Sequence, residues 1–310
     1  MFLIVVMLQK SGNMIGYIYL SLALFAGIAK GFCGKKISAS MQTFRDCLFI
    51  NATRMLCCAF IGFILVIINW DFSALPLSGN SIGVYLLSAV GMTTFCVCWM
   101  YAYKQDAYIF LNIFTMLGSI VTCFLSFIVY REPITWQQWI GMAILFSAVV
   151  IMSKYNTKIK GKLSWVGICI LIVGCLGCAI TDFSQKVYMK DIGNSAAVFN
   201  FYTYAFGFVI LLIMQAFIIG REKSFKITNE VVSKKYLFAY FAMSLFLFLN
   251  TSLKTLAAGI LPSAQIYPVL QGANLILSGL MAHFIFKEKL DTRSIVAMVL
   301  AFIGLIIINM

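Results

Sequence analysis

The segment FIVYREPITWQQW (residues 127–139) ends a long apolar run with the charged pair Arg131 and Glu132, and a similar phrase, IFKEKLDTRS, returns at residues 285–294. Each phrase places a short charged break between one apolar stretch and the next. The chain as a whole is 62% hydrophobic and only 11% charged. Soluble domains carry about 25% charged residues, so the composition excludes a soluble globular domain and predicts a membrane protein.

The apolar runs between such breaks are long enough to span a bilayer, whose hydrocarbon core of roughly 30 Å requires about 20 helical residues. They are apolar on all sides and do not alternate in polarity, so we predict helices and not the strands of a membrane barrel. Almost nothing remains outside them, and any function is therefore expected among the helices. The ten predicted spans are 15–34, 47–69, 81–101, 108–130, 136–153, 164–184, 196–219, 236–253, 262–286 and 294–310.

The sequence also contains an internal repeat. At an offset of 150 residues Lys104 aligns with Lys254, and at an offset of 156 the two opening phrases align Glu132 with Glu288. Each copy holds five spans, and an odd number of crossings turns the second copy upside down, which is typical of secondary transporters. The predicted organisation is an N-terminal segment at 1–13, ahead of a second candidate start at Met14, then a five-helix repeat at 14–155 and an inverted five-helix repeat at 156–310.

The two repeated glutamates mark the connection between the fourth and fifth helix of each copy. Glu132 and Glu288 precede helices predicted to begin near Ile134 and Thr292. A carboxylate there complements the positive end of the helix dipole by about 0.3–1 kcal/mol. A direct role in transport is the alternative.

Several of these features together resemble a known family. The duplicated YREP and FKEK ends, the stretch YPVLQGANLILSGLMAHFIFKEKL at 267–290 and Arg54 in the second span are similar to the ten-helix EamA-like members of the drug/metabolite transporter superfamily. The resemblance covers essentially the whole chain. It implies a carrier that moves small metabolites such as amino acids, sugars or drugs by exchange or together with a proton.

Charged side chains inside a span are candidates for function, because each costs at least about 2.5–3.5 kcal/mol at the bilayer centre. Lys30 and Arg54, near the same mouth, suit an anionic group such as a carboxylate, or else their long side chains snorkel toward water. Asp182 either pairs locally with Lys186, one helical turn away, or gathers a substrate amine or carries a coupling proton. His283, the only histidine, is an interfacial residue or a second coupling candidate.

Neutral polar and aromatic side chains gather around the helix breaks at Pro262 and Pro268. These prolines free backbone carbonyls, which only a cavity or a neighbouring helix can satisfy. The amides among these side chains have an alternative role, since Asn and Gln also join helices by hydrogen bonds. The predicted substrate-binding residues are Lys30, Arg54, Trp99, Tyr103, Asn112, Asp182, Tyr202, Asn250, Tyr267, Gln271 and Asn274.

The remaining motifs concern partners and reaction classes. Small residues at four-residue spacing, such as Ala297 with Ala301, let helices approach closely, and they predict a scaffold or homodimer face through the helices near 136–153 and 294–310. The cysteine pairs lack the second pair that a zinc site requires. No Walker loop, catalytic triad or zinc-protease spacing occurs, so we expect neither an ATP-driven pump nor an enzyme, and no cofactor or metal.

The distribution of lysine and arginine predicts an orientation. Most of them lie in the connectors after the odd-numbered spans, which places the loops 154–162 and 220–235 in the cytoplasm and both termini outside the inner or plasma membrane of the cell. The net charge of +13 then reflects loops beside anionic lipid and calls for no nucleic acid. The expected partners are the lipid bilayer and a small-molecule solute.

The combined prediction is a secondary active transporter, an exporter or exchanger of a small polar or amphipathic metabolite such as an amino acid or a drug-like compound. It is expected to work by alternating access around a central cavity between the two repeats. One alternative is a flippase for lipid-linked sugars or polyprenyl phosphates, because Lys30 and Arg54 suit a phosphate equally well. The other is a non-transporting membrane sensor on the same scaffold.

Overall fold

The computed structural model describes residues 14–38, 40–104, 108–153, 165–193, 195–222, 227–229, 231–284 and 292–310. Some helical residues in these ranges, among them Tyr103, Asn112 and His283, are described by their backbone alone. The described residues form α-helices joined by short connectors, with a 3-10 turn and a short π-helix and no strand. The elements are α2 (Met14–Ser38), α3 (Phe44–Ile68), η1 (Asp71–Ala74), α4 (Gly79–Lys104), α5 (Tyr108–Tyr130), α6 (Trp136–Ser153), α7 (Trp165–Val187), η2 (Tyr188–Ile192), α8 (Ala196–Glu222), α9 (Lys234–Ile260), α10 (Ser263–Phe284) and α11 (Thr292–Asn309).

Each of the ten predicted spans corresponds to one helix of the described chain. Several helices extend a few residues further than predicted. α9 extends furthest, through Lys254 to Ile260, and α7 continues through Lys186 to Val187. The prediction ends both spans before their lysines because a charge usually marks the edge of the membrane. Here each lysine is paired with a carboxylate from another part of the bundle, so the helix continues inside it.

The surface of the bundle is suited to lipid. Phe60, Phe217 and Phe238 are among the large apolar side chains that lie exposed on the outside, as expected for a protein surrounded by hydrocarbon. By length and composition alone, six helical segments in the described ranges qualify as membrane spans, and two shorter apolar helices accompany them. The six are Met14–Ser38, Phe44–Ile68, Gly79–Tyr101, Cys169–Ile192, Ala196–Arg221 and Tyr236–Ile260, and the shorter two are Thr115–Tyr130 and Ile295–Asn309.

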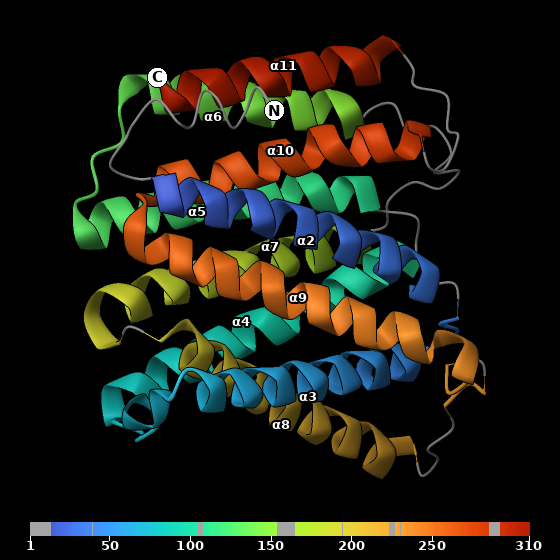
Figure 1. Cartoon of the computed structure of the whole chain (residues 1–310). Coiled ribbons are helices and arrows are strands. Elements are labelled where there is room, and N and C mark those ends of the chain that lie inside the picture. Colours follow the sequence, from blue (N-terminus) through green and yellow to red (C-terminus); the bar gives the residue numbers. More distant parts are fainter. Residues whose placement is uncertain are drawn as a thin grey trace.

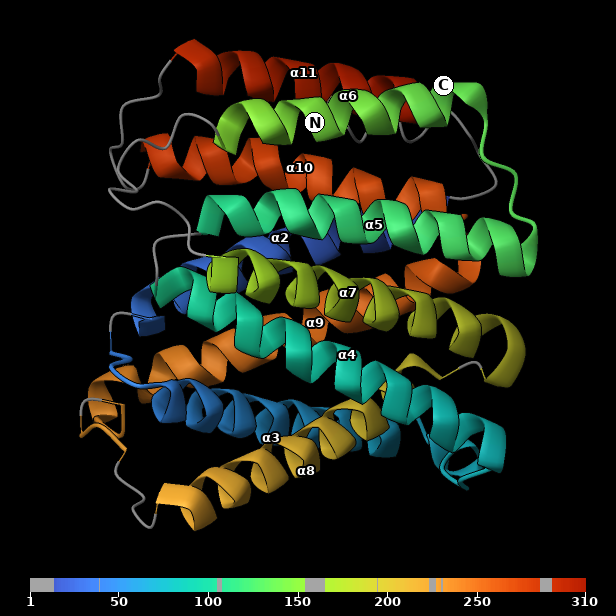
Figure 2. The ribbon, with the colours of Figure 1, turned by 180° about the vertical axis from the view of Figure 1, so that it is seen from behind.

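The helices run back and forth, so successive connectors lie at opposite ends of the bundle (Figure 1). The first half comprises α2 to α6 and the second α7 to α11. The first helices of the halves, α2 and α7, run in opposite directions (Figures 1 and 2). Each helix in the following pairs packs against a helix of the other half. α2 packs along α9 and α4 along α7, while α3 packs against α8 and α6 against α11. Each contact therefore has its counterpart when the halves are swapped, which confirms the predicted inverted repeats.

The pair α6 and α11 forms one edge of the bundle (Figure 1). A Cβ added at Gly141 would lie 2.8 Å from the carbonyl oxygen of Gly304, so the two backbones are nearly in contact. Ala148, Ala297 and Ala301 are buried. The small residues predicted to bring helices together thus join α6 to α11 within the chain, while a homodimer through the outer faces of these helices stays a prediction.

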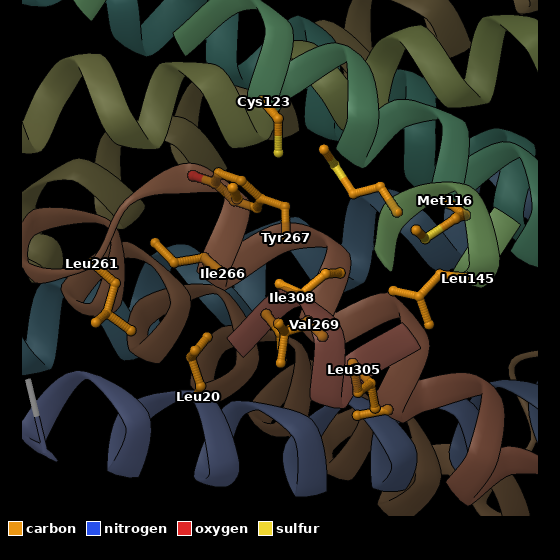
Figure 3. Close-up of a cluster of buried hydrophobic side chains, with 14 of the residues drawn as sticks. Leu20, Met116, Cys123, Leu145, Leu261, Ile266, Tyr267, Val269, Leu305 and Ile308 are labelled. Carbon is orange, nitrogen blue, oxygen red and sulfur yellow. The ribbon is translucent and has the colours of Figure 1, made fainter. Parts of the chain in front are cut away.

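Side chains from α2, α5, α6, α9, α10 and α11 meet in one apolar cluster beneath this edge (Figure 3). Leu20, Leu145 and Leu305 are fully buried there. Tyr267 joins the same cluster with its ring, while its hydroxyl bonds to α7. The apolar core therefore borders directly on the polar residues of the candidate site.

At the opposite edge, α3 packs along α8, and hydrogen bonds from the connectors that flank them join the pair at both ends of the bundle. At one end the Asp46 carboxylate accepts hydrogen bonds from the hydroxyl and the N–H of Thr228, at 2.8 and 3.0 Å. At the other end the Ser195 hydroxyl donates to Asp71 at 2.5 Å. Between these tethers the helices are close, because a Cβ added at Gly62 would lie 3.1 Å from the Phe201 backbone. The α3–α8 pair is thus a clamped unit.

Candidate functional site

Two cations from different helices meet at one tryptophan. The Nζ of Lys30, on α2, lies 5.4 Å from the centroid of the Trp99 indole, and the Cζ of Arg54, on α3, lies 5.5 Å from it. The indole packs against α2 at Gly34, where a side-chain carbon would overlap the ring. Such contacts are worth about 0.5–2 kcal/mol each. We call Lys30, Arg54 and Trp99 the Trp99 cluster, and its three members were predicted from separate helices.

Arg54 is enclosed by protein. Only 1% of its surface is exposed, so the predicted alternative of snorkelling toward water does not describe it. Its Nη1 donates to the side-chain oxygen of Asn51 at 2.9 Å, and its buried Nε has no hydrogen-bond partner among the described residues. The ion pairs of the described residues involve neither Arg54 nor Lys30. The guanidinium therefore has a buried donor without an acceptor among the described residues.

A second group of polar residues comes from α7, α9 and α10. The buried Asp182 carboxylate forms an ion pair with Lys254, and the Tyr267 hydroxyl donates to the backbone carbonyl of Asp182 at 2.6 Å. The Cys178 thiol lies 3.7 Å from the second oxygen of the same carboxylate. We call Asp182, Lys254 and Tyr267 the Asp182 cluster. The predicted local pair of Asp182 with Lys186 is wrong, because Lys186 turns toward the end of the bundle and bonds there.

The two clusters are neighbours inside the bundle. Lys30 is within electrostatic range of both Arg54 and Lys254. The Trp99 cluster comes from the first half of the chain and the Asp182 cluster from the second, so the combined site lies where the halves meet. Its described charges are three cations, Lys30, Arg54 and Lys254, against one carboxylate, Asp182, which leaves an excess of positive charge.

Two of the predicted amides lie between α9, α10 and α2. A Cβ added at Gly27 would lie 3.0 Å from the Asn250 amide nitrogen and 3.6 Å from the Asn274 side-chain oxygen. Asn250 donates to the Ala23 carbonyl at 2.6 Å, which is the helix-joining role that the sequence left open. Gln271, also on α10, is partly buried.

Tyr202 is not brought to this site. The Tyr202 hydroxyl donates to the Leu75 carbonyl at 2.7 Å, and its ring stacks on Tyr85 at 4.8 Å, beside the connector that follows α3. Tyr202 therefore packs α8 against its neighbours. The side chains of Tyr103, Asn112 and His283 lie outside the described part of the chain, as does the whole of Glu288.

Glu132 organises the end of the bundle at which α2 begins and α11 ends. Its Oε1 lies 2.8 Å from the Nζ of both Lys186 and Lys190, and its Oε2 accepts the Ser263 N–H at 2.9 Å. Lys186 also donates to the Leu261 carbonyl at 2.7 Å. We call Glu132, Lys186, Lys190 and the Ser263 N–H the Glu132 network. Glu132 thus caps α10, whereas the sequence predicts that it complements the start of α6.

These contacts stabilise the ionised form of Glu132. Burial alone would raise the pKa of Glu132, but the hydrogen bonds from Lys186, Lys190 and the Ser263 N–H outweigh it and lower the pKa to about 2. The network joins the ends of α5 and α7 to the start of α10. In the described residues α5 packs extensively along α7, while the counterpart pair, α10 and α2, meets over a shorter stretch. The Tyr17 hydroxyl, near the start of α2, donates to Gln265 near the start of α10 at 3.0 Å, so α2 and α10 also meet at this end of the bundle.

Sequence reasoning missed Lys254 as a site residue and Lys190 as a partner of Glu132. Lys254 stands directly after the predicted span 236–253, where a connector residue is expected. Its alignment with Lys104 in the repeat was the available signal, since a charge kept at matching places in both halves marks a position inside the symmetric bundle. No local pattern links Lys190 to a glutamate 58 residues away.

Two inverted five-helix halves with a buried charged site at their interface define a membrane transport protein of the inverted-repeat class. The chain belongs to the EamA-like transporter family, whose sequence profile matches residues 14–154 and 165–310, one match in each half. This confirms the resemblance found in the sequence. The fold is also similar to a solved structure titled "Crystal structure of protein", with a TM-score of 0.69, 11% identity and 96% of each chain covered. At that identity the likeness concerns the fold alone.

Proposed function

We propose that this protein is a secondary active transporter, an exporter or exchanger, for a small polar or amphipathic metabolite such as an amino acid or a drug-like compound. The observation that carries the proposal is the division of the site between the halves. Lys30, Arg54 and Trp99 come from the first half, and Asp182 and Lys254 come from the second. In inverted-repeat carriers the solute binds at the interface between the repeats, near the middle of the membrane.

Alternating access is supported by the inverted relation of the two halves. At the end where α2 begins and α11 ends, the Glu132 network ties α5, α7 and α10, and the Tyr17 hydroxyl of α2 donates to Gln265 of α10 at 3.0 Å. Two inverted halves with nearly equal structures can exchange conformations, so that contacts of this kind close one end of the bundle in one state and the opposite end in the other. In the proposed cycle the bundle opens at one end and then at the other, with the Trp99 and Asp182 clusters between them.

Transport is tested with the purified protein in two steps. A thermal-shift screen across amino acids, sugars, nucleobases and cationic dyes identifies solutes, because a ligand of the folded state raises stability by RT ln(1 + [L]/Kd). Each radiolabelled hit is then followed by counterflow into proteoliposomes. Uptake that saturates, fails with Asp182→Asn and persists with the matched control Asp191→Asn supports the carrier. Linear uptake that no variant alters refutes it.

We further propose that the protein lies in the inner or plasma membrane of the cell with both termini outside, because the basic connectors then face the cytoplasm. Trp70 and Val232 are 79% and 64% exposed and lie in connectors at opposite ends of the bundle. In a background without native cysteines, Trp70→Cys is expected to react with a membrane-impermeant maleimide on intact cells. Val232→Cys is expected to react only after lysis, and the reverse result would invert the assignment.

A further inference from the structure

Arg54 stands apart from the other buried charges of the described chain. Asp46, Asp182 and Lys186 each have their charge compensated: Asp46 by several hydrogen bonds, and the other two by an ion pair with a residue distant in the sequence. Arg54 is as deeply buried as they are, yet among the described residues it donates a hydrogen bond only to the neutral Asn51. An ion removed from water without an opposite charge costs several kcal/mol, so this position favours any anion that reaches it.

The donors that an anion requires are already grouped. A guanidinium carries five N–H groups in a planar fork that matches a carboxylate or a phosphate, and in Arg54 the buried Nε has no described acceptor. Lys30 lies over the same indole as Arg54 and has no ion pair with a described residue. Two like charges that share one ring repel each other, and an oxyanion between them would remove that repulsion.

The nearby carboxylate does not supply this anion. Asp182 is joined to Lys254, and its second oxygen lies beside the Cys178 thiol. The Asp182 cluster is thus balanced within itself, and the positive excess of the site belongs to the Trp99 cluster. A solute with an anionic group would neutralise this excess.

We infer that the Trp99 cluster is an oxyanion subsite, at which Arg54 and Lys30 hold a carboxylate or phosphate group of the transported solute beside the Trp99 ring. The inference rests on the proposed transport function and narrows its substrate class to anions. Charge-assisted hydrogen bonds to both cations fix the group, and the indole and the adjoining Asp182 cluster face the rest of the solute.

The test is binding to the full chain in detergent, measured by calorimetry with three probes and their uncharged counterparts. Succinate is compared with succinamide, glycerol 3-phosphate with glycerol, and farnesyl phosphate with farnesol. We expect at least one anion to bind at least about tenfold more tightly than its counterpart, since a hydrogen bond to a charged group contributes about that factor. Preference for succinate, glycerol 3-phosphate or farnesyl phosphate identifies a carboxylate, a soluble phosphate ester or a lipid-linked phosphate.

Variants assign the binding to this cluster. Arg54→Gln and Lys30→Gln are each expected to weaken binding of the preferred anion at least about tenfold. Arg54→Lys is expected to weaken it less, because lysine keeps the positive charge but lacks the planar set of donors of the guanidinium. Arg221→Gln, at the exposed end of α8, is the matched control and is expected to bind as the wild type does. If Arg54→Gln does not fold, Lys30→Gln and Arg54→Lys test the same subsite.

The inference is overturned if no anion binds better than its uncharged counterpart, or if the variants bind as the wild type does. Its failure is distinct from failure of the carrier. If an uncharged solute shows counterflow and no anion binds, the transport proposal holds and the oxyanion subsite is refuted. If an anion binds in a way that depends on Arg54 but shows no counterflow, the subsite holds and the carrier is refuted.

Discussion

Replacing Glu132 with glutamine tests whether the Glu132 network stabilises the fold. The amide keeps the shape of the side chain but removes its charge. Lys186, with a side chain that is 2% exposed, then loses its carboxylate, and Lys190 loses the same partner. The N–H of Ser263 at the start of α10 keeps only a neutral acceptor.

The size of the effect follows from the pKa of Glu132, which is lowered from 4.5 to about 2. A difference of about 2.5 pKa units corresponds to about 3 kcal/mol in favour of the charged form at neutral pH. The side chain is 12% exposed, so solvent screening removes little of this. Removal of one partner from a buried ion pair typically costs about 3–5 kcal/mol, which is the same order. We therefore expect Glu132→Gln to lower the free energy of unfolding by about 3 kcal/mol at pH 7.

The pH dependence gives the sign of the effect. Because the pKa in the folded state lies below the ordinary value, the contribution of the carboxylate is complete above pH 5 and is lost as the pH falls toward 2. The wild type therefore loses this stability in acid, while the glutamine variant has none to lose. The difference between the two is expected to shrink to about half by pH 3.

The assay is thermal unfolding of the purified protein in detergent at pH 7 and pH 3. A loss of about 3 kcal/mol corresponds to a Tm lower by about 5–10 °C at pH 7. Asp191→Asn is the control, since Asp191 is exposed at the same end of the bundle and bonds to the Tyr130 hydroxyl. Its Tm is expected to change little. A Tm of Glu132→Gln that stays at about the wild-type value, or a difference that is the same at both pH values, would contradict the reasoning.

Three further predictions concern the interior. Asp182→Asn leaves Lys254 without its carboxylate and is expected to lower the free energy of unfolding by about 3–5 kcal/mol, measured by denaturant unfolding. The double variant Asp182→Asn with Lys254→Met is expected to recover most of this stability. An equal loss in the single and the double variant would be inconsistent with the ion pair. Gly304→Ala separates α6 from α11 and is expected to cost about 1–3 kcal/mol in the same measurement. Gly34→Ala displaces the Trp99 ring and is expected to shift tryptophan emission and weaken solute binding in titrations, where unchanged emission would argue against the contact.

The fold was predictable because long apolar runs leave few choices. A run of about 20 apolar residues requires a helix that spans the membrane, and five spans per repeat require inversion. The end of α9 was predicted too early, at Lys254. The charge of Lys254 resembled a membrane boundary, and only the three-dimensional structure reveals the carboxylate that accepts it inside the bundle.

The candidate site was predictable where a charged residue stands inside an apolar span, as Lys30, Arg54 and Asp182 do, because burial of such a charge is costly. It was not predictable where a residue belongs to the site only through a partner distant in the sequence. Lys254 meets Asp182 across 72 positions, and Glu132 meets the Ser263 N–H across 131. No local spacing encodes such contacts, because they depend on how the halves interlock. Tyr202 was predicted from residue type alone, and its ring is taken up by aromatic stacking.

The tethers at Asp46 and Asp71 bear on how the protein changes shape. They join the start of α3 to the connector that follows α8, and the turn after α3 to the residue before α8, so we expect these two helices to move together. α2, α7 and α10, which carry Lys30, Asp182 and Tyr267 of the charged site, lie outside this pair of helices. If they move relative to it, we expect the packing within the α3–α8 pair to persist, so that only the contacts along its border have to be remade.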